Sequence, residues 1–265
     1  MTADVTPILM KGAGRMGGAM IAGWARAKAF SERELMILDP FPGDVALTAA
    51  KAGALLNPPD EAIGRAKTVV LAIKPQQWRE AVGELAPHLA EGAVVVSIVA
   101  GLAAADIADA LQRPVARVMP TQGAAIGQGT ASIFAADAAA RARAHALFDP
   151  IGVCIDLADE EQMHAATALS GSSPAYLYAF IAALEAAGPG VGLTPEQSRQ
   201  LARSTIAGAA ALLHQSGEDP AHLRDQVTSK GGTTAAALAV LMPGLGPLLD
   251  EAVKAATERS RELGR

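Results

Sequence analysis

The chain has 265 residues, of which 51% are hydrophobic and 3% aromatic, and its formal net charge is −5. This length and apolar content exclude a disordered chain and suit a two-domain enzyme subunit with sizeable cores. Charges of both signs are interspersed, so no basic face indicates a nucleic-acid partner and no polybasic cluster indicates a membrane partner. We therefore expect a protein that acts on a small molecule.

Cysteine use points to a reducing compartment. Cys154 is the only cysteine and lies in the apolar stretch 151–155, which excludes an internal disulfide and suits the cytoplasm. We expect its side chain to be a small buried hydrophobe rather than a nucleophile. Residues 1–4 lack a positive region followed by an apolar core, so we expect no export signal.

The first predicted element is a strand at 7–10, followed at once by a glycine-rich turn, Gly12-Ala13-Gly14-Arg15-Met16-Gly17. In a dinucleotide-binding turn, Gly12 permits the tight strand-to-helix turn, Gly14 leaves room for the pyrophosphate, and Gly17 lets the helix pack against its strand. Such a string also arises by chance. The strand before it and the helical spacing of apolar residues after it favour a cofactor site that includes Gly12, Gly14, Arg15, Met16 and Gly17.

The second predicted strand, 34–38, ends at Asp39. An acidic residue there would bind the ribose hydroxyls of NAD; the alternative is a solvated aspartate at the proline-rich turn 39–43. A carboxylate about 4 Å from a 2′-phosphate charge would be opposed by about 4 kcal/mol at an effective dielectric constant of about 20. We therefore favour NADH over NADPH, although Arg15 could offset this repulsion.

Three further apolar runs, at 67–73, 93–98 and 115–119, are continuous rather than alternating. Continuous apolarity indicates burial on both faces, as in a parallel sheet that helices cover. The segments 76–89 and 103–111 are predicted to be helical crossovers. Two more strands, 130–134 and 153–157, flank a predicted helix at 137–148 and complete the sheet. Residues 1–158 are thus predicted to form an α/β, doubly wound, Rossmann-like domain.

After Leu157 the sequence is rich in alanine and leucine and lacks β-branched runs, which predicts an all-α domain over 159–265. The expected helices are 159–169, 174–187, 195–215, 220–227, 233–241 and 245–263. The stretch 162–184 carries no formal charge, but serine, glycine and proline at its middle favour two buried helical pieces over a membrane span. Alanine-rich faces bury little area alone, so we expect a homodimer through this half.

Several motifs occur in a distinctive order along the chain. They are Ala-Ile-Lys-Pro-Gln at 72–76, Ser-Ile-Val-Ala-Gly at 97–101, Arg-Val-Met-Pro at 117–120, Thr-Ala-Leu-Ser-Gly-Ser-Ser-Pro-Ala-Tyr at 167–176, Leu-Leu-His-Gln-Ser-Gly at 212–217 and Val-Thr-Ser-Lys-Gly-Gly-Thr-Thr at 227–234. Together they resemble the pyrroline-5-carboxylate reductase family over essentially the whole chain. The resemblance implies NAD(P)H-dependent reduction of the cyclic imine 1-pyrroline-5-carboxylate to L-proline, an N-terminal dinucleotide domain, and a C-terminal dimerisation domain whose dimers assemble further in many members.

The last motif suggests how the substrate is held. Its glycines, Gly231 and Gly232, precede a predicted helix, so backbone N–H groups can point at a carboxylate, and a threonine hydroxyl adds a donor. From the residues alone, a turn with an N-cap is the simpler interpretation. By the resemblance, Thr234 hydrogen-bonds near the ring nitrogen and carboxylate. The expected catalytic set is Ser229, Lys230, Gly231, Gly232, Thr233 and Thr234.

Other segments border this chemistry. Ala72, Lys74 and Pro75 follow a buried strand at the sheet edge where ligands bind, and we assign them to the cofactor site, with an exposed lysine before a proline turn as the alternative. The segment 170–174 either breaks two helices or, by the resemblance, borders the substrate pocket. His164 and His214 are expected to be packed or interfacial, and no ligand spacing predicts a metal site.

The chain departs from the family at two places. The family usually has Asn-Thr-Pro after Met-Pro, where this chain has Thr121-Gln122-Gly123, and it has proline where Lys230 stands. Tighter anion binding and an altered substrate therefore stay open. A related imine reductase or hydroxyacid dehydrogenase is the rival enzyme, but no lysine lies between 159 and 187 where the dehydrogenase needs one. A non-catalytic dinucleotide-binding regulatory protein is the rival outside catalysis.

Overall fold

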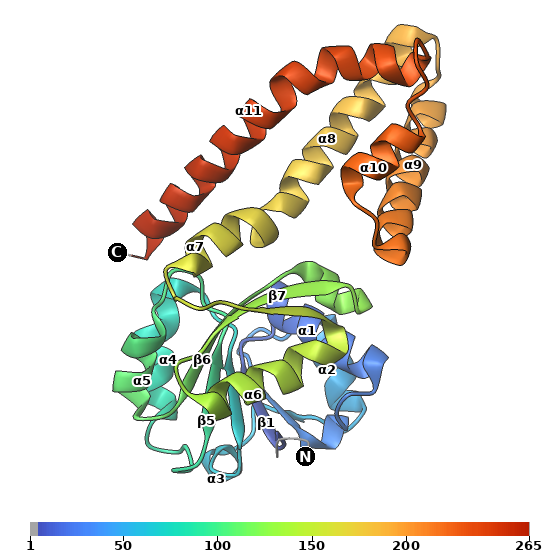
Figure 1. The fold of residues 1–265 in the computed structure, drawn as a ribbon. Coiled ribbons are helices and arrows are strands. Elements are labelled where there is room, and N and C mark those ends of the chain that lie inside the picture. The colour runs from blue at the N-terminus through green and yellow to red at the C-terminus, as the bar shows by residue number, and fades with distance from the viewer. Residues whose placement is uncertain (1–4, 265) are drawn as a thin grey trace. The chain divides into compact units, whose positions relative to one another are not determined.

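The computed structural model describes residues 5–264, so the expectation about an export signal, which depends on residues 1–4, lies outside the described residues. The chain forms two compact units (Figure 1). Of the described residues, the first unit contains 5–171 and 256–264, and the second contains 172–255. The composition changes earlier, after Leu157.

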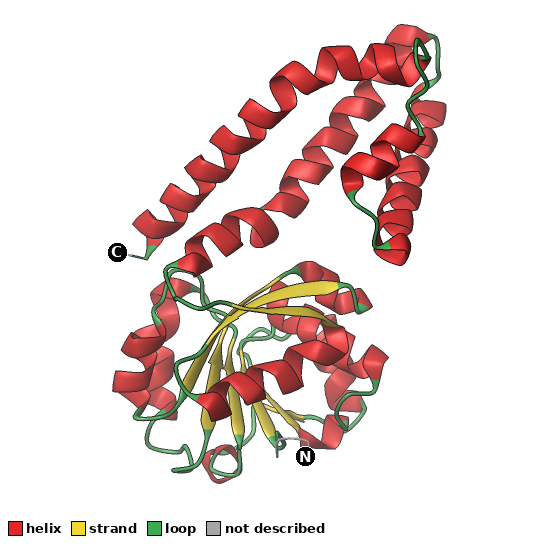
Figure 2. Cartoon of the chain, in the orientation of Figure 1, coloured by secondary structure: helices red, strands yellow, loops and turns green. Residues whose placement is uncertain are grey.

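The first unit is built on an eight-stranded sheet with the strand order β3-β2-β1-β4-β5-β6-β7-β8 (Figure 2). The strands are β1 (Ile8–Lys11), β2 (Leu35–Leu38), β3 (Leu55–Leu56), β4 (Thr68–Leu71), β5 (Val94–Ser97), β6 (Val115–Pro120), β7 (Gly129–Phe134) and β8 (Gly152–Asp156). All neighbours are parallel except β6 and β7, which are antiparallel. The order reverses beside β1, as in dinucleotide-binding sheets. The predicted α/β doubly wound fold is confirmed.

Helices cover both faces of this sheet. They are α1 (Arg15–Ala27), α2 (Asp44–Lys51), α3 (Asp60–Ile63), α4 (Trp78–Leu85), α5 (Ala104–Leu111), α6 (Ala138–Phe148) and α7 (Gln162–Ala166). Successive strand residues point to opposite faces. Thus Val70 packs in the cluster that contains residues of α1 and α6, whereas Val69 packs in the cluster that contains residues of α4 and α5. Burial on both faces explains the continuous apolar runs.

Short turns complete the first unit. Four 3₁₀ turns, η1 (Glu32–Glu34), η2 (Pro75–Gln77), η3 (Gln122–Ile126) and η4 (Asp149–Ile151), connect strands and helices. The helix predicted at 159–169 is instead α7 followed by a π-helical turn, η5 (Thr167–Gly171). The hydroxyls of Thr167 and Ser170 donate to the carbonyls of Met163 and Ala166, at 2.7 Å each. These side-chain bonds compete with the regular helical ladder and fit its widening at this point.

The second unit is helical, as predicted. It contains α8 (Ser173–Ala187), the 3₁₀ turn η6 (Gly188–Val191), α9 (Pro195–Ser216), α10 (Pro220–Gln226) and most of α11 (Thr233–Leu263). Thr194 and Gln197 form a capping box at the start of α9. The two helices predicted at 233–241 and 245–263 are wrong, because they form the single helix α11 with Pro243 and Pro247 inside it. Each proline removes one intrahelical hydrogen bond, which bends a helix without having to end it.

Helices α8 and α11 leave their apolar side chains uncovered in the single chain. Neither helix contains a buried residue, so the prediction that both pieces of 162–184 are buried is wrong for α8. The exposed large hydrophobic residues of these helices are Leu177, Tyr178, Phe180, Leu184, Val240, Leu241, Met242, Leu245, Leu248, Leu249 and Leu263. By length and composition alone, α11 is also apolar enough to cross a membrane. Exposed apolar faces of this kind indicate a surface that another protein or a membrane covers.

Candidate active site

The glycine-rich turn joins β1 to α1 next to the end of β4. Gly12 has φ +93°, and a Cβ placed on it would lie 2.6 Å from the Ala72 carbonyl oxygen. A Cβ on Gly17 would overlap the Gly12 carbonyl oxygen. Both positions therefore accept only glycine without a shift of the backbone, the first for its conformation and the second for the close packing of α1 against the turn.

Gly14 has a different environment. It is the N-cap residue of α1 without a side-chain capping hydrogen bond, and a Cβ on it would meet nothing within 4 Å. The N–H groups at the start of α1 therefore face open space, and the positive end of the helix dipole lies at the same place. This arrangement fits a dinucleotide pyrophosphate. Beside it, Arg15 is exposed and Met16 is half-buried.

Asp39 lies at the end of β2, beside the turn. Its Oδ2 accepts a hydrogen bond from the Ala13 N–H at 2.7 Å, and its Oδ1 accepts one from the Phe41 N–H at 2.8 Å. Asn57 holds the Asp39 backbone, since its Oδ1 accepts from the Asp39 N–H at 2.9 Å and its Nδ2 donates to the Asp39 carbonyl at 3.0 Å. Asp39 thus orders the glycine-rich turn while keeping its charge at the sheet edge. Sequence analysis missed Asn57, whose signal was the turn sequence Asn-Pro-Pro.

A cavity of about 560 Å³ opens at this turn. Its lining residues are Ala13, Gly14, Arg15, Gly18, Ala19, Ala22, Phe41, Gly43, Asp44, Val45, Gln122 and Ala125. Gln122 belongs to the segment that departs from the family pattern. The departure at 121–123 therefore lies on the same cavity as the glycine-rich turn, and a difference there is positioned to affect what this cavity binds.

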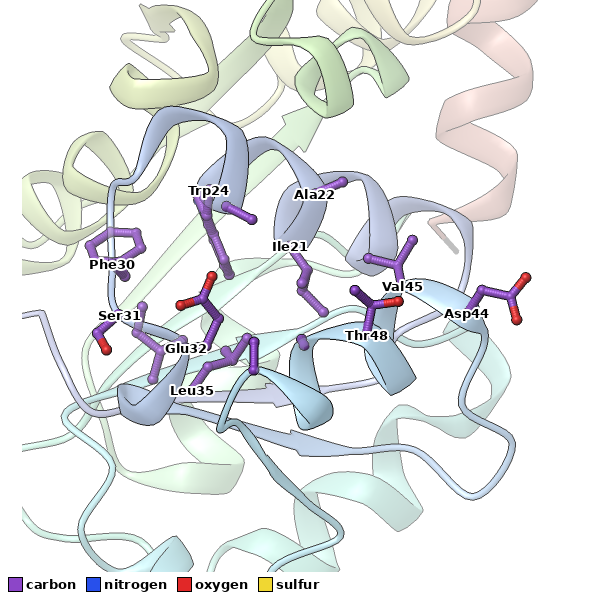
Figure 3. A pocket seen from close by; sticks show the side chains of 14 residues that line it. Ile21, Ala22, Trp24, Phe30, Ser31, Glu32, Leu35, Asp44, Val45 and Thr48 are labelled. Carbon is purple, nitrogen blue, oxygen red and sulfur yellow. The ribbon is translucent and has the colours of Figure 1, made fainter.

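A second pocket, of about 300 Å³, lies between α1 and α2 (Figure 3). Ile21, Trp24, Phe30 and Leu35 point into it from an otherwise mostly apolar lining, and Glu32 and Asp44 are its charged members. None of the predicted site residues lines it. It offers packing surface but no cluster of catalytic groups.

The other predicted cofactor residues lie beside the turn. The Ala72 N–H donates to the Lys11 carbonyl at 2.8 Å, which fixes the end of β4 next to Gly12. Lys74 is exposed and precedes η2, whose first residue is Pro75. The π-helical turn reaches the same edge, because a Cβ on Gly171 would lie 3.6 Å from Cγ of Met119 near the end of β6. The first unit thus gathers Ala72, Lys74 and Pro75 with the glycine-rich turn.

The predicted substrate residues belong to the second unit, where they form the turn before α11. Gly231 has φ +72°, and the Gly232 N–H donates to the Ser229 carbonyl at 3.0 Å. Lys230 is exposed, α11 begins at the exposed Thr233, and Thr234 is half-buried. The turn therefore presents a helix N-terminus, two glycines, hydroxyls and a lysine together, which suits an anionic group.

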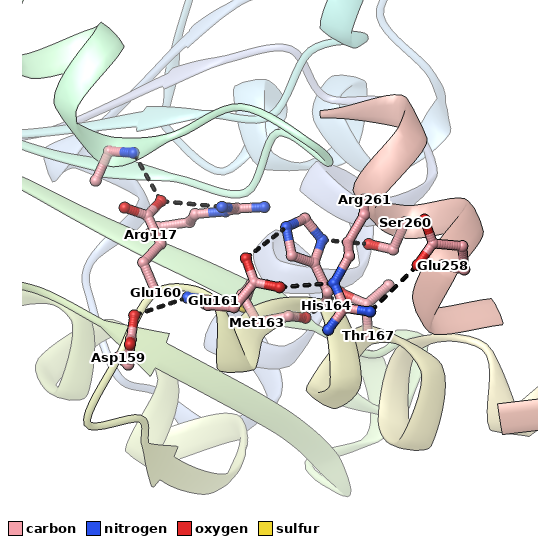
Figure 4. A network of polar contacts seen from close by, with 11 residues as sticks. Arg117, Asp159, Glu160, Glu161, Met163, His164, Thr167, Glu258, Ser260 and Arg261 are labelled. Carbon is pink, nitrogen blue, oxygen red and sulfur yellow. Dashed lines mark hydrogen bonds and ion pairs between the residues drawn. The ribbon is translucent and has the colours of Figure 1, made fainter. Parts of the chain in front are cut away.

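Ion pairs link the turn before α7 to strand β6 and to the end of α11 (Figure 4). The nearly buried Arg117 of β6 donates to Glu160 Oε1 at 2.9 Å, and the same oxygen accepts from the Ala104 N–H at 2.8 Å. Arg261 donates to Glu161 at 2.6 Å. The hydrogen bond to Arg261 holds the pKa of Glu161 below its ordinary value. These ion pairs contribute to holding the turn before α7 and the end of α11 within the sheet unit.

The histidines and the cysteine have specific surroundings. His164 Nδ1 lies 2.9 Å from Ser260 Oγ, so this residue is packed as expected, whereas His214 is exposed in the single chain. Cys154 is half-buried rather than buried, and burial with a hydrogen bond to Asp149 raises the pKa of its thiol to about 12. Such a thiol is no nucleophile at neutral pH. Although no ligand spacing predicted a metal site, the fold brings His145, Asp149 and Cys154 together.

Family models match two parts of the chain. The model described as pyrroline-5-carboxylate reductase dimerisation matches residues 160–263, and the model described as NADP oxidoreductase, coenzyme F420-dependent, matches residues 8–101. The first match covers the helical half of the chain, and the second covers strands β1 to β5 of the sheet.

Individual relatives match nearly the whole chain. Proteins named pyrroline-5-carboxylate reductase from Pseudomonas aeruginosa and Pisum sativum are 36% and 35% identical, and each match covers 95% of this chain and 94% of the relative. The solved structure of such a reductase from Coxiella burnetii has a TM-score of 0.90 at 29% identity and covers 99% of this chain and 100% of that one. The structure of pyrroline carboxylate reductase from Plasmodium falciparum with NADP bound has a TM-score of 0.84 at 25% identity, with both chains fully covered.

Proposed function

This chain belongs to the pyrroline-5-carboxylate reductase family, and we propose that it reduces 1-pyrroline-5-carboxylate to L-proline with NADH or NADPH. The observation that carries the proposal is the glycine-rich turn at the reversal point of the sheet, with N–H groups facing an open cavity, in a chain that matches reductases over nearly its full length. The family resemblance suggested by the motifs is thereby confirmed.

The first unit holds the cofactor. When bound, the nicotinamide supplies the hydride that reaches the C=N carbon. The N–H groups at the start of α1 hold the pyrophosphate, and Asp39 hydrogen-bonds the adenosine ribose. Ala72, Lys74 and Pro75 form the wall at the end of β4. The support for these roles is the packing of Gly12 against Ala72 and the bonding of Asp39 to Ala13.

The second unit fixes the substrate. The N–H group of Gly231 and the hydroxyls of Thr233 and Thr234 hold the carboxylate and ring nitrogen. Gly232 and Ser229 shape the turn, because the Gly232 N–H donates to the Ser229 carbonyl at 3.0 Å. Lys230, where the family has proline, adds a positive charge for the carboxylate. Because the imine enters already protonated, catalysis consists mostly of positioning.

The chain self-associates through its helical half, which is the family's dimerisation region. We assign the exposed apolar faces of α8 and α11 to a homodimer, from which higher oligomers are built, rather than to a membrane. The single cysteine and the interspersed charges of both signs support a cytoplasmic location.

Asp39 makes NADH the preferred cofactor. Its two carboxylate oxygens are held by backbone N–H groups, so its charge cannot swing away from a 2′-phosphate. We expect kcat/KM to be at least tenfold higher with NADH, a preference that Asp39→Asn weakens while retaining one acceptor oxygen. Equal or better efficiency with NADPH would contradict this preference.

The reaction is tested with the purified chain by following NADH and NADPH oxidation with and without 1-pyrroline-5-carboxylate. We expect rapid oxidation that depends on the imine and falls strongly in Thr234→Ala, with unchanged cofactor affinity. Lys254→Ala, on the same helix but in an Asp250 ion pair, is the matched control. Cofactor binding without imine-dependent oxidation would instead indicate the regulatory alternative.

A further inference from the structure

A cluster of metal-ligating side chains lies outside the proposed active site, where α6, η4 and β8 meet. His145 is in α6, Asp149 begins η4, and Cys154 is in the edge strand β8. The potential ligand atoms of these three residues all lie within 4.8 Å of one another. His145 Nδ1 is 3.0 Å from Asp149 Oδ1. The side chains of His145 and Asp149, from the end of α6 and the start of η4, thus meet the side chain of Cys154 from β8.

The spacing of these residues along α6, η4 and β8 explains why their side chains meet. His145 and Asp149 are four residues apart, which places them on one side of the chain where α6 passes into η4. Cys154 and Asp156 alternate with Val153 and Ile155 along β8, so they point to the same face of the strand. The exposure agrees, since Val153 and Ile155 are 60% and 43% exposed while Cys154 packs at the edge of the core beneath α6.

Asp156 supplies the supporting contact that metal-binding histidines require. Its Oδ2 lies 3.2 Å from His145 Nε2. A carboxylate that accepts the Nε2 proton leaves the Nδ1 lone pair directed at Asp149 and Cys154, and it fixes the orientation of the ring. Arg141 lies 3.9 Å from the other Asp156 oxygen and helps to hold that carboxylate in place.

We propose that His145 Nδ1, the Asp149 carboxylate and Cys154 Sγ bind a divalent ion of the zinc class. One nitrogen, one oxygen and one sulfur ligand match the borderline-soft preference of Zn²⁺, and water completes a tetrahedron. Ligand atoms around tetrahedral zinc are about 3.3–3.6 Å apart, so side-chain rotations are enough to close the cluster. Binding releases the thiol proton to solvent, and the thiolate and Asp149 balance the charge of the ion.

The occupied site would tie the sheet's edge strand to α6. Its role is structural, because none of its residues lines the cavity at the glycine-rich turn. The inference is independent of the proposed reductase activity, and its test uses no turnover measurement.

Cobalt provides a direct test, because Cys154 is the only cysteine in the chain. The full-length protein, freed of metal and kept without thiol reductants, is titrated with Co²⁺. We expect a near-ultraviolet thiolate-to-cobalt absorption that saturates at one equivalent and disappears when Zn²⁺ is added. Zn²⁺ should also raise the melting temperature of the wild-type protein.

Variants distinguish a built site from a lone thiol. Cys154→Ser should abolish the absorption, and the conservative Asp149→Asn should weaken Co²⁺ affinity at least tenfold. Asp156→Asn should keep the absorption but weaken affinity about 10- to 100-fold, the usual effect of removing a supporting carboxylate. The control is His88→Gln, which removes a histidine that pairs with Asp60 elsewhere on the surface. Melting in the presence of a chelator checks that each variant is folded.

Two results would overturn the proposal. One is the absence of thiolate absorption in wild-type protein at saturating Co²⁺. The other is an absorption that Asp149→Asn and His145→Ala leave unchanged, which would mean that the thiol alone binds cobalt.

Discussion

The sheet unit and the helical unit are both rich in apolar residues, yet they use them in opposite ways. In the sheet, Val69 and Val95 are fully buried within the single chain. In the helical unit, Val240 is 81% and Leu248 65% exposed, and the buried positions are the small residues Gly188, Ser198 and Ala202. The sheet unit therefore carries its own core, whereas the helical unit leaves an apolar surface uncovered in the single chain, which is the surface assigned above to the proposed homodimer.

The largest expected effect comes from breaking that surface. Leu241, Leu245 and Leu248 lie on one face of α11, because they are spaced at i, i+4 and i+7, and all three are exposed. Burial of one such side chain contributes about 1.5–3 kcal/mol, and a symmetric dimer counts each change twice. We expect the double variant Leu241→Asp and Leu248→Asp to sediment as a monomer and to lose activity.

The matched control places the same substitution on the sheet unit. Leu55 of β3 is 41% exposed, so Leu55→Asp should leave the sedimenting mass unchanged. A dimeric double variant would contradict the assignment of this α11 face to the interface.

The next effect tests the claim that the sheet unit is self-contained. Arg117 is 4% exposed and bound to Glu160. Removal of one partner from a buried ion pair costs about 3–5 kcal/mol, so Arg117→Met should lower the free energy of unfolding by about 3 kcal/mol in urea titrations. Arg259→Met, which removes an exposed pair with Glu262, should change little. If the two variants lowered the free energy of unfolding equally, the Arg117–Glu160 ion pair would not stabilise the sheet unit more than an exposed pair does.

Substitutions of Gly12 and Gly14 should affect protein stability and cofactor affinity differently. Gly12→Ala places a Cβ against Ala72 at positive φ, so it should cost about 2 kcal/mol of stability and also impair cofactor binding. Gly14→Ala meets no protein atom within 4 Å, so stability should be unchanged while NADH affinity falls about tenfold, or about 1.4 kcal/mol. Calorimetric titration and urea unfolding measure both quantities. If the Gly14→Ala variant bound NADH as tightly as the wild type, the assignment of the pyrophosphate to this turn would be wrong.

A smaller effect is expected at the turn of the helical unit. Lys230 is exposed, and an exposed charge pair contributes about 0.5–1 kcal/mol. Lys230→Ala should therefore raise the KM for the imine acid about threefold and change kcat less. Initial rates at varied imine concentration distinguish the two parameters, and unchanged kinetics would exclude a substrate role for Lys230.

The smallest effect is the pH dependence at Glu161. Its hydrogen bond to Arg261 lowers its pKa from the ordinary 4.5, so its contribution to stability is present above pH 4.5 and is lost as the pH falls through the lower, folded-state value. The melting temperatures of wild type and Glu161→Gln should differ near neutral pH and converge in acid. A difference that stays constant over this range would contradict the ion pair.

Local patterns predicted most of the sheet unit and less of its surroundings. The continuous apolar runs located the strands from β1 to β8 except β3, which has two residues and too little pattern to detect. The polar break after Ser170 was visible in the sequence, but the exposure of α8 in the single chain was not predictable. Periodicity identifies an apolar face without showing what covers it. Pro243 and Pro247 led to the prediction of two helices where α11 is one helix. A proline inside a helix either ends it or only bends it, and the local sequence does not show which occurs.

The residues of the sites also differ in how far the sequence predicted them. The glycine-rich turn is local in sequence, so its residues could be named in advance. Asn57, Arg117 with Glu160, and the cluster around Cys154 depend on segments that meet only after folding. Neither composition nor spacing gives the distance between such segments, which is why sequence analysis missed them.

The most direct test of the proposed activity is to measure, in one reaction, the NADH consumed and the L-proline formed from 1-pyrroline-5-carboxylate by the purified chain. We expect equal amounts of NADH consumed and L-proline formed, and neither process when the imine is omitted. NADH consumption without L-proline, or cofactor binding with no consumption at all, would show that this chain is not an imine-acid reductase.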